Sequence, residues 1–515
     1  MQSLYVRGEN VKKCISFLLC LCLALALVAC GQEDAYVPTG NGLAPEEGET
    51  AYVPPQQVEQ ELTLTYYADR SMNPYASTDF TNRALFSLMY QGLFVIDRNY
   101  DAQPILCSRY TVSKDLKTYT FYIDEKATFS NGTAVTIQDV LASFQAAQKS
   151  TYYGGRFKFV SSMALSGDGG LTIKMKSGYE NLPLLLDIPV VPAGEVNAAN
   201  PIGSGPYILS GETLRKRADW WCRAEMSITA EAIVLKKAES TIQIRDEFTF
   251  GDLNLVCTDP GSDKYTDYRG DYELWDCENG IFLYITCNSA STVFSNETVR
   301  KALTHAIDRD TLAKDYYRGF ARPATLPASP LFPHYSAVLA EKYGYDPVKF
   351  AEALKDTGLR GQTIKILVNK KDTLRLRTAR KIGQMLKECG LVVEMKELTD
   401  SSYTSALRNW DYDLYVGQTK LSANMDLSEF FSTNGALSWG GINDVTTYTL
   451  CRQAIENHGN YYTLHQNVME NGYLCPILFR SYGIYATRGL LTSLTPSRDS
   501  VFFYTIGKTV TPETI

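Results

Sequence analysis

Three neighbouring segments decide the fold: Thr118-Tyr-Thr-Phe-Tyr-Ile123, Phe129-Ser-Asn-Gly-Thr133 and Thr136-Ile-Gln-Asp-Val140. Side chains in the first segment alternate between polar and apolar, which predicts a β-strand. The Asn-Gly pair in the second segment is a strong turn signal. Thr136 and Asp139 predict the N-terminal cap of an amphipathic helix from Ile137 to Phe144. A strand, a turn and a capped helix in close succession indicate a mixed α/β protein.

Segments further along the chain extend this pattern. The residues after Ser295 predict a helix with one buried face, because Val299, Leu303 and Ala306 follow the helical spacing. Asp308 or Asp310 is expected to cap a second helix. A helix from Ala379 to Leu386 between two strands predicts a β-α-β unit. Further strands are predicted at Leu62–Tyr67, Leu171–Lys176, Tyr207–Leu209, Ile364–Val368 and Val392–Met395, and a further helix at Phe350–Leu354.

The N-terminus predicts export. Arg7, Lys12 and Lys13 form a basic front, and the run from Cys14 to Val28 is almost wholly apolar. A basic region, an apolar core and small residues before a cysteine are typical of a signal peptide, here residues 1–29. Leu27-Val28-Ala29-Cys30 resembles the lipobox of bacterial lipoproteins, which implies a lipid on Cys30. An uncleaved transmembrane anchor is the alternative, and both place the rest of the chain outside the cytoplasm.

Residues 30–58 predict a flexible tether. They are rich in Pro and Gly, repeat Ala-Tyr-Val-Pro at 35–38 and 51–54, and show no apolar periodicity. A flexible chain of this length has a mean reach of about 30 Å. The tether would hold a folded body away from a membrane surface.

Composition excludes several classes of function. The chain has 515 residues and a formal charge of −7 without a basic block, so we expect no nucleic-acid partner. Eight cysteines lie after Cys30 without a C-x-x-C pair, several of them in apolar strings, so we expect mostly free, buried thiols. Histidine occurs only four times. We therefore expect neither a cofactor nor a metal site built by the protein.

Seven segments in register resemble family 5 extracytoplasmic solute-binding proteins, the peptide/nickel class of bacterial ABC importers. The resemblance runs from about residue 60 to 505 and includes the fold-deciding block described first. The other six segments are Asn73-Pro74, Pro201-Ile-Gly-Ser-Gly-Pro-Tyr207, Gly251-Asp-Leu-Asn-Leu-Val256, the helix pair from Val299 to Arg309, Asp411-Tyr-Asp-Leu-Tyr415 and Cys475-Pro-Ile-Leu478.

The resemblance implies an α/β, two-lobed fold of the type II periplasmic-binding-protein class with an extra inserted domain. The expected domain II is the insertion at 84–199, and lobe III covers 281–487. Lobe I is discontinuous and takes the segments 59–83, 200–280 and 488–515.

The same resemblance implies a function without chemistry. The expected protein is a monomeric, lipid-anchored receptor on the extracytoplasmic face of the bacterial cell membrane. It captures a peptide or peptide-like solute between two lobes and delivers it to an ABC permease and its ATPases. A signalling receptor for ligands such as pheromone peptides is the alternative, and a secreted enzyme on the same scaffold is a minor one. His305 and Asp308 invite a catalytic interpretation, but no nucleophile or oxyanion hole accompanies them, so no catalytic residue is expected.

Ligand contacts follow from the resemblance residue by residue. Thr78 and Phe80 are expected to face the cleft, and Tyr284 to line it. Peptide-binding members hold the ligand's α-amino group with an Asp, whose matching position here is Ser422. The ligand set is completed by Gln418, Thr419 and Trp439.

Two of these positions leave alternatives open. Ser422 offers a neutral hydroxyl, which cannot supply a charge-assisted hydrogen bond to an ammonium group. Asp426 could take that role, or could cap a helix from Leu427 to Phe431. Trp439, in a Gly-rich loop, is either a cleft residue or packing. Peptide, opine, glycan and chelated metal all stay open as ligands.

Overall fold

A computed structural model describes residues 61–222, 225–226, 228–262, 264–491, 494–505 and 509–515. The expected signal peptide, the tether and Cys30 lie outside the described residues. Within the described part of the chain, none of the helices combines the length and the apolar character that crossing a membrane requires.

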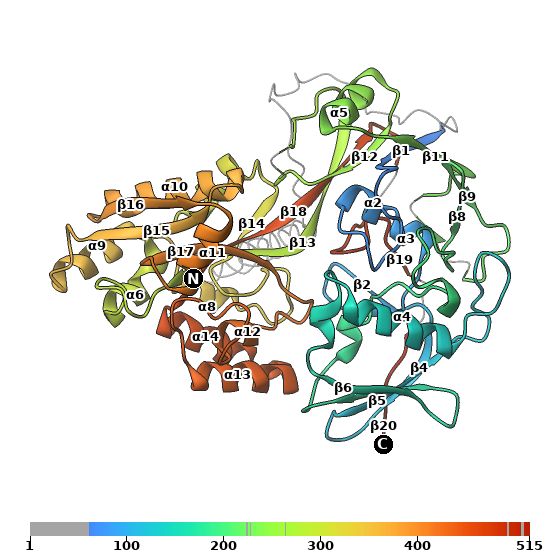
Figure 1. The fold of residues 1–515 in the computed structure, drawn as a ribbon, viewed down its shortest axis with the longest axis horizontal. Helices are drawn as coiled ribbons and strands as arrows, with labels where there is room; N and C mark the ends of the chain where they lie inside the picture. Colours follow the sequence, from blue (N-terminus) through green and yellow to red (C-terminus); the bar gives the residue numbers. More distant parts are fainter. Residues whose placement is uncertain (1–60, 223–224, 227, 263, 492–493, 506–508) are drawn as a thin grey trace, which may run out of the picture. The chain divides into compact units, whose positions relative to one another are not determined.

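The fold-deciding block forms as predicted. Strand β5 covers Thr118–Ile123, and helix α4 covers Ile137–Lys149 (Figure 1). Thr136 caps α4: its backbone N–H donates to Asp139 Oδ2 at 2.8 Å, and the Asp139 N–H donates to Thr136 Oγ1 at 3.3 Å. The helix runs further than predicted and ends where Ser150 becomes extended.

The segment expected as domain II builds a five-stranded sheet in the order β20-β4-β5-β7-β6. Its edge strand β20 comes from the C-terminal end of the chain and pairs in parallel with β4. This pairing differs from the expected boundary, which assigns all of 488–515 to lobe I. The bounds are β4 Cys107–Val112, β6 Val160–Leu165, β7 Leu171–Met175 and β20 Glu513–Thr514, with β2 Phe94–Ile96 pairing β3 Ala102–Pro104 and short helices η1 Gly154–Phe157, η2 Leu182–Leu185 and η3 Ala193–Glu195.

A four-stranded sheet combines the expected lobe I segments from both sides of the insertion. Strand β1 pairs in parallel with β11, although they are far apart in the sequence, and β9 and β8 follow as antiparallel neighbours. Leu62, Leu64, Ile233 and Leu235 are buried beneath this sheet. The bounds are β1 Leu62–Tyr66, β8 Tyr207–Ser210, β9 Thr213–Lys216, β11 Ala232–Lys237, α2 Phe80–Ala84, α3 Phe86–Met89 and α5 Thr241–Phe250, with β10 Glu225–Met226 pairing β19 Tyr504–Thr505.

The largest sheet has seven strands, in the order β12-β18-β13-β17-β15-β16, with β14 paired to β18. Strands β15 and β16 are parallel and are joined by α10, which confirms the predicted β-α-β unit. Ile364, Ile366, Ala379 and Ile382 are fully buried where α10 covers the sheet. The bounds are β12 Leu255–Thr258, β14 Ala321–Pro323, β15 Thr363–Asn369, β16 Val392–Leu398, β17 Leu414–Lys420 and α10 Thr373–Glu388.

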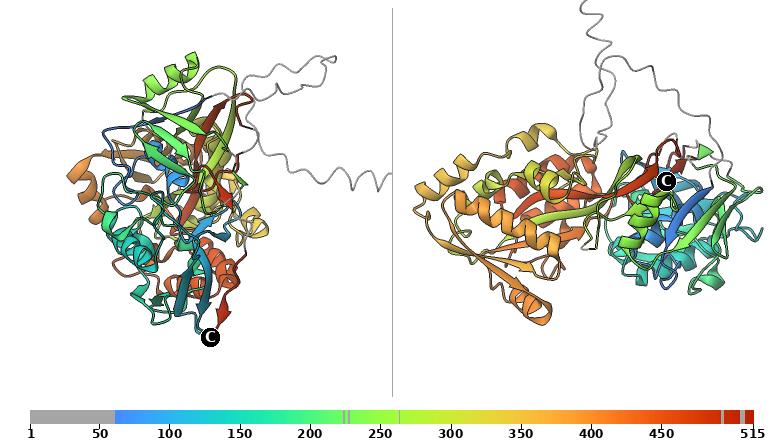
Figure 2. Two further views of the ribbon diagram at one scale, coloured as in Figure 1. Left: turned by 90° about the vertical axis from the view of Figure 1, so that its right-hand side faces the viewer. Right: turned by 90° about the horizontal axis from the view of Figure 1, so that it is seen from above.

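Strand β13 crosses the expected boundary between lobes I and III, and its partner β18 ends at the next expected boundary. Strand β13 covers Tyr272–Cys287 and β18 covers Leu474–Thr487, and they pair antiparallel along their length (Figure 2). The ladder is interrupted between Glu278 and Phe282, where Gly280 has a φ of +71°. The expected 280/281 boundary falls at this irregularity, inside one strand.

Helices complete the lobe III segment. The helix predicted after Ser295 begins at Glu297 with Asn296 as its cap, and continues as a short 3₁₀ segment. Asp308, one of the two expected caps, accepts a hydrogen bond from the Thr311 N–H at 3.0 Å. The bounds are α6 Glu297–Ala302, η4 Leu303–Ala306, α7 Arg309–Thr311, η5 Leu312–Tyr316, α8 Ala337–Glu341, α9 Pro347–Asp356, α11 Asp400–Arg408, α12 Ser428–Phe431, α13 Val445–Glu456, η6 His458–Asn460 and α14 Tyr461–Asn471.

The cysteines behave as small apolar side chains. All eight in the described residues are buried, and the thiols of six of them are free. Burial raises the pKa of the Cys257 thiol to about 12, so it stays protonated at neutral pH. The six free thiols are Cys257, Cys277, Cys287, Cys389, Cys451 and Cys475.

Candidate ligand-binding site

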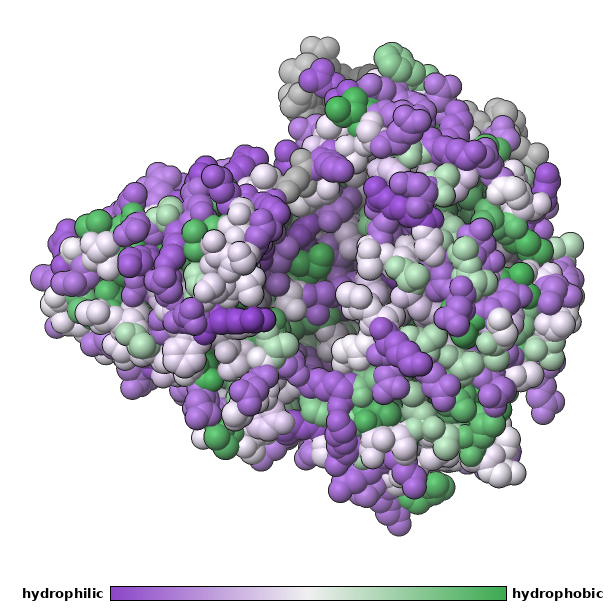
Figure 3. All heavy atoms as spheres, in the orientation of Figure 1, coloured by the Kyte–Doolittle hydropathy of each residue, from purple (hydrophilic) through white to green (hydrophobic). Residues whose placement is uncertain are grey.

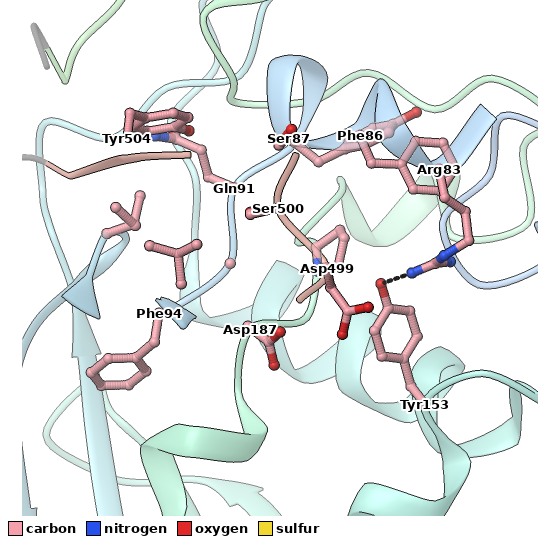
Figure 4. A pocket seen from close by; sticks show the side chains of 15 residues that line it. Arg83, Phe86, Ser87, Gln91, Phe94, Tyr153, Asp187, Asp499, Ser500 and Tyr504 are labelled. Carbon is pink, nitrogen blue, oxygen red and sulfur yellow. Dashed lines mark hydrogen bonds between the residues drawn. The ribbon is translucent and has the colours of Figure 1, made fainter. Parts of the chain in front are cut away.

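Two cavities share Arg83 and Asp499 as wall residues, and they form the candidate site; Figure 4 shows the larger one. The larger has a volume of about 50 Å³ and the smaller about 20 Å³. Their walls come from α2, α3 and β2, the segments around η1 and Asp187, β18 and residues 498–504. Figure 3 shows a hollow near the centre of one face of the molecule, with many hydrophilic residues around it.

Asp499 is the buried carboxylate at the centre of the site. It accepts hydrogen bonds from Arg156 Nη2 at 3.0 Å, from Lys420 Nζ at 2.6 Å, and from the Tyr152 hydroxyl. Burial alone would raise the pKa of Asp499, but the neighbouring cations, Lys420 first, lower it far below its usual range. Asp499 is therefore ionised at all physiological pH values and joins β17 to the η1 segment.

Arg156 extends this network to a second carboxylate. It donates to Asp499 and also forms an ion pair with Asp187. Burial raises the pKa of Asp187, although Arg156 opposes the rise. Two cations, Arg156 and Lys420, thus balance the two carboxylates of this network.

Arg83 enters the site from α2. Its Nη1 donates to the carbonyls of Pro74 and Ser77, at 3.2 and 3.1 Å, and its Nη2 donates to the Tyr153 hydroxyl at 2.8 Å. The guanidinium carbon lies 3.3 Å from the centre of the Tyr152 ring. Carbonyl groups and aromatic rings therefore hold the positive charge of Arg83 in place.

Arg498 lines the smaller cavity and is only partly satisfied. Its Nη2 donates to the Leu421 carbonyl at 2.6 Å, whereas Nη1 has no hydrogen-bond partner in the described residues. The guanidinium lies against Gly280, where a Cβ would come within 2.5 Å of its nitrogens. Nearby, Glu278 accepts hydrogen bonds from the Tyr100 and Ser329 hydroxyls, and burial raises its pKa.

Phe80 and Thr78 lie on the wall of the smaller cavity. The Phe80 ring stacks on Tyr482 of β18, with 3.5 Å between ring centres. Aromatic and apolar side chains therefore line the same cavity as Arg498.

The other expected ligand residues lie elsewhere. Tyr284 is 1% exposed and packs edge-on against Phe430 within the core of the lobe III segment. Gln418 bridges β17 to its neighbours: it donates to Asp372 and accepts from Arg480. None of the expected residues on β13, β17 or the following loops lines either cavity.

Ser422, Thr419 and Trp439 complete these placements. The Ser422 hydroxyl donates to Asn424 Oδ1 at 2.6 Å, and Thr419 is half-buried opposite Phe282. Trp439 is half-buried and packs against the aromatic core. Asp426 accepts from the Ser428 N–H and pairs with Lys158 at 3.0 Å, so its carboxylate is already occupied.

Sequence reasoning missed the charged residues that build the site. Arg156 and Asp499 lie 343 residues apart, and Arg498 precedes Asp499 in an ordinary polar segment. No local sequence pattern indicates such a pair, because only the fold brings the two residues into contact. A weak signal was available in Ser497-Arg498-Asp499, a charged pair between apolar segments near the C-terminus.

A search for known families gives one clear match. The family model "Bacterial extracellular solute-binding proteins, family 5 Middle" matches residues 101–440, well over half of the chain. The chain belongs to this family. The resemblance that the sequence motifs predict is confirmed.

One curated relative and two solved structures are similar to this family 5 protein. The glutathione-binding protein GsiB of Shigella flexneri serotype 5b is 26% identical over 317 residues, which is 56% of this chain and 59% of the relative. The structure of NikA from Brucella suis, in complex with Fe(III)-EDTA, matches with a TM-score of 0.67 at 18% identity. The match covers 86% of this chain and 98% of the NikA chain. The oligopeptide-binding protein AppA from Bacillus subtilis, in complex with a nonapeptide, has a TM-score of 0.60 at 20% identity, with 87% and 99% covered.

These comparisons settle the fold. The family 5 protein has the mixed α/β, two-lobed type II binding-protein fold, as the sequence predicts. The family and the relatives are those of binding proteins, in agreement with the expectation that the chain is not an enzyme. The sequence match spans 59% of the length of the curated relative. The domain boundaries stay predictions.

Proposed function

We propose that this family 5 protein is the solute receptor of an ABC importer. It captures a peptide or peptide-like solute and delivers it to a permease driven by cytoplasmic ATPases. The observation that carries the proposal is the buried, charged cavity pair around Arg83 and Asp499, in a chain that belongs to a solute-binding family. Polar groups held in an enclosed site bind a solute strongly once water leaves.

Capture requires the walls of the site to separate. The cavities hold only a few water molecules at their present size, so a peptide enters when the contacts around Asp499 part. Strands β13 and β18 are the continuous connection that would bend. Polar contacts that would open include Lys420–Asp499 at 2.6 Å and Lys158–Asp426 at 3.0 Å.

Thr78 and Phe80 are the proposed ligand contacts with the most support, since both line the smaller cavity. The other proposed ligand contacts apply to an open form of the protein, in which the walls of the site have separated. They are Gln418, Thr419, Ser422 and Trp439.

A ligand screen tests the proposal. Purified protein would be heated with di- and tripeptides, glutathione, opines and chelated nickel, and hits would be titrated by calorimetry. A true ligand at 100 times its dissociation constant adds about 2.7 kcal/mol to the free energy of unfolding. Phe80→Ala should weaken the binding of that ligand. Phe250→Ala is the control, because it removes an exposed ring on α5 and should leave the affinity unchanged. If every class leaves the melting temperature unchanged, the proposal fails.

We also propose that Cys30 carries a lipid on the extracytoplasmic side of the membrane and that the receptor acts as a monomer. In cells, Cys30→Ala should release the protein into the medium or leave it unprocessed. Continued attachment of a processed Cys30→Ala chain would contradict the anchor. Light scattering of the purified chain would check the monomer.

A further inference from the structure

The charges around the smaller cavity do not balance. Arg156 and Lys420 pair with Asp187 and Asp499, as described above. Arg83 and Arg498 also line the cavity, and among the described residues neither forms an ion pair. The third nearby carboxylate, Glu278, accepts hydrogen bonds from two hydroxyls, so four cations lie near three carboxylates. The wall therefore carries excess positive charge.

A buried arginine without an ion pair is not unusual in this chain, and Arg309 shows how it is normally satisfied. Its Nε donates to the Ala324 and Pro476 carbonyls, its Nη1 to the Thr304 and Ile307 carbonyls, and its Nη2 to Thr304 Oγ1. Arg83 is satisfied in a similar way by carbonyls and Tyr153. Arg498 differs, because its buried Nη1 has no partner.

Other arginines with an unpartnered nitrogen do not reach the site. Arg322 and Arg375 form ion pairs with Asp276 and Asp372, and Arg452 donates to Ser177. None of the three lines either cavity, whereas Arg498 does. A buried N–H of a charged group without an acceptor costs free energy, and an incoming acceptor removes that cost.

The carboxylates near the site are not free to hold a ligand's ammonium group. Asp499 is shared by Arg156 and Lys420, and Asp426 is paired with Lys158. Ser422 stands at the position where peptide-binding members are expected to hold that group. An ammonium group would add charge to a wall that already has too much, whereas an anion would compensate it.

We propose that the site recognises its solute through a carboxylate group bound by Arg498, beside the stacked rings of Phe80 and Tyr482. This deepens the proposed function and rests on it. A carboxylate offers planar oxygens to a guanidinium edge and brings a single negative charge, which matches one unpartnered donor. The aromatic wall favours an apolar group of the solute next to that carboxylate.

The test uses small aromatic probes that differ in the charge and chemistry of one polar group. The full chain would be titrated with benzoate, benzamide, benzylamine and phenyl phosphate at constant ionic strength, following the melting temperature. Benzoate should bind at least about tenfold more tightly than benzamide, since charge-assisted hydrogen bonds exceed neutral ones by this much. Equal binding of benzoate and benzamide, or preference for benzylamine, overturns the proposal. Preference for phenyl phosphate overturns the assignment to carboxylate.

Variants then test whether the preference for benzoate depends on Arg498. Arg498→Gln should abolish the preference for benzoate, and Arg498→Lys should keep part of it. Arg480→Gln is the matched control, since Arg480 is equally buried but pairs with Asp259 and lines neither cavity. A preference that survives in Arg498→Gln overturns the proposal. If Arg498→Gln does not fold, Arg498→Lys and the wild-type probe series still decide.

A second probe pair separates this inference from the proposed function. Trialanine and its C-terminal amide would be titrated in the same way. If both bind equally, the receptor function stands and the carboxylate inference fails. If neither binds but the benzoate preference holds and depends on Arg498, the carboxylate inference stands and the peptide class is the part that fails.

Discussion

Asp499 shows how one residue can hold a site together. It is 9% exposed at its side chain and takes hydrogen bonds from Arg156, Lys420 and Tyr152, which lie on different parts of the chain. Without it, Lys420 and Arg156 would share only Asp187, the ion-pair partner of Arg156. The cost of leaving them uncompensated exceeds what the ion pairs themselves contribute.

Asp499→Asn is therefore expected to lower the free energy of unfolding by about 3–5 kcal/mol, measured by urea denaturation. Asp271→Asn is the matched control, since Asp271 pairs with Arg488 in an exposed position and should cost at most about 1 kcal/mol. Equal losses for the two variants would contradict the central role of Asp499.

Tyr284 and Phe80 differ in role, since Tyr284 packs in the core and Phe80 is a proposed ligand contact. Tyr284 fills the aromatic core, whereas Phe80 is half-buried on a cavity wall. Tyr284→Ala should cost about 3–5 kcal/mol of unfolding free energy, as large aromatic truncations do. Phe80→Ala should cost less and act mainly on solute affinity. A Tyr284→Ala variant with wild-type stability but weakened binding would instead restore Tyr284 to the cleft.

At the scale of elements, the irregularity in β13 positions the site. Gly280 adopts a φ of +71° between the two paired halves of the strand, and its missing side chain makes room for the Arg498 guanidinium. A kink in the hinge strand and the place of a candidate binding residue thus depend on one glycine.

Gly280→Ala should destabilise the protein through both the positive φ and the clash with Arg498. Gly211→Ala isolates the first effect, because Gly211 has a φ of +62° and open space around its Cα. The backbone cost is about 1 kcal/mol in each variant, so any larger loss in Gly280→Ala reports the clash. Equal melting temperatures for the two variants would show that Arg498 moves aside freely.

Elements whose signals are local were predictable from the sequence. The capped helix α4, strand β5 and the β15-α10-β16 unit follow from alternation, capping and helical spacing over a few residues. The full length of β13 and β18 did not follow. Strand β18 is almost wholly buried and carries no alternation, and β13 joins a half-buried polar start to a buried second half. The C-terminal strand β20 was missed since its partner β4 lies at the opposite end of the sequence.

The whole molecule should lose stability in acid through its buried histidines. Burial, together with His334, lowers the pKa of His465 to about 3, and burial also lowers the pKa values of His334 and His458. The unfolded chain binds the proton below pH 6.5 while the folded chain does not, so folding weakens as the pH falls from 6.5 toward 3. For His465 alone the loss at pH 5 is about 2 kcal/mol.

His465→Leu tests this sign. Neither ring nitrogen of His465 has a hydrogen-bond partner in the described residues, so the variant should be at least as stable as wild type at pH 7.5. Its free energy of unfolding should fall by about 2 kcal/mol less than that of wild type between pH 7.5 and pH 5. Parallel pH curves for the two proteins would contradict the assignment.

The candidate site was predictable in part. Thr78 and Phe80 were reached through a resemblance, and the structure places both on a cavity wall. Arg83, Arg156, Arg498 and Asp499 were out of reach, because each is an ordinary charged residue in its own segment. Their role arises only when the fold brings three distant segments together and removes water from between them.

The late position of Asp499 also sets an order in time. A chain made from its N-terminus carries Arg156 and Lys420 before their shared counter-charge, since Asp499 follows Arg156 by 343 residues. Until that residue is added, closing the cluster would bury cations without compensation. The growing polypeptide therefore gains little by collapsing early around this region. Completion of the binding site therefore waits for the segment that carries Asp499.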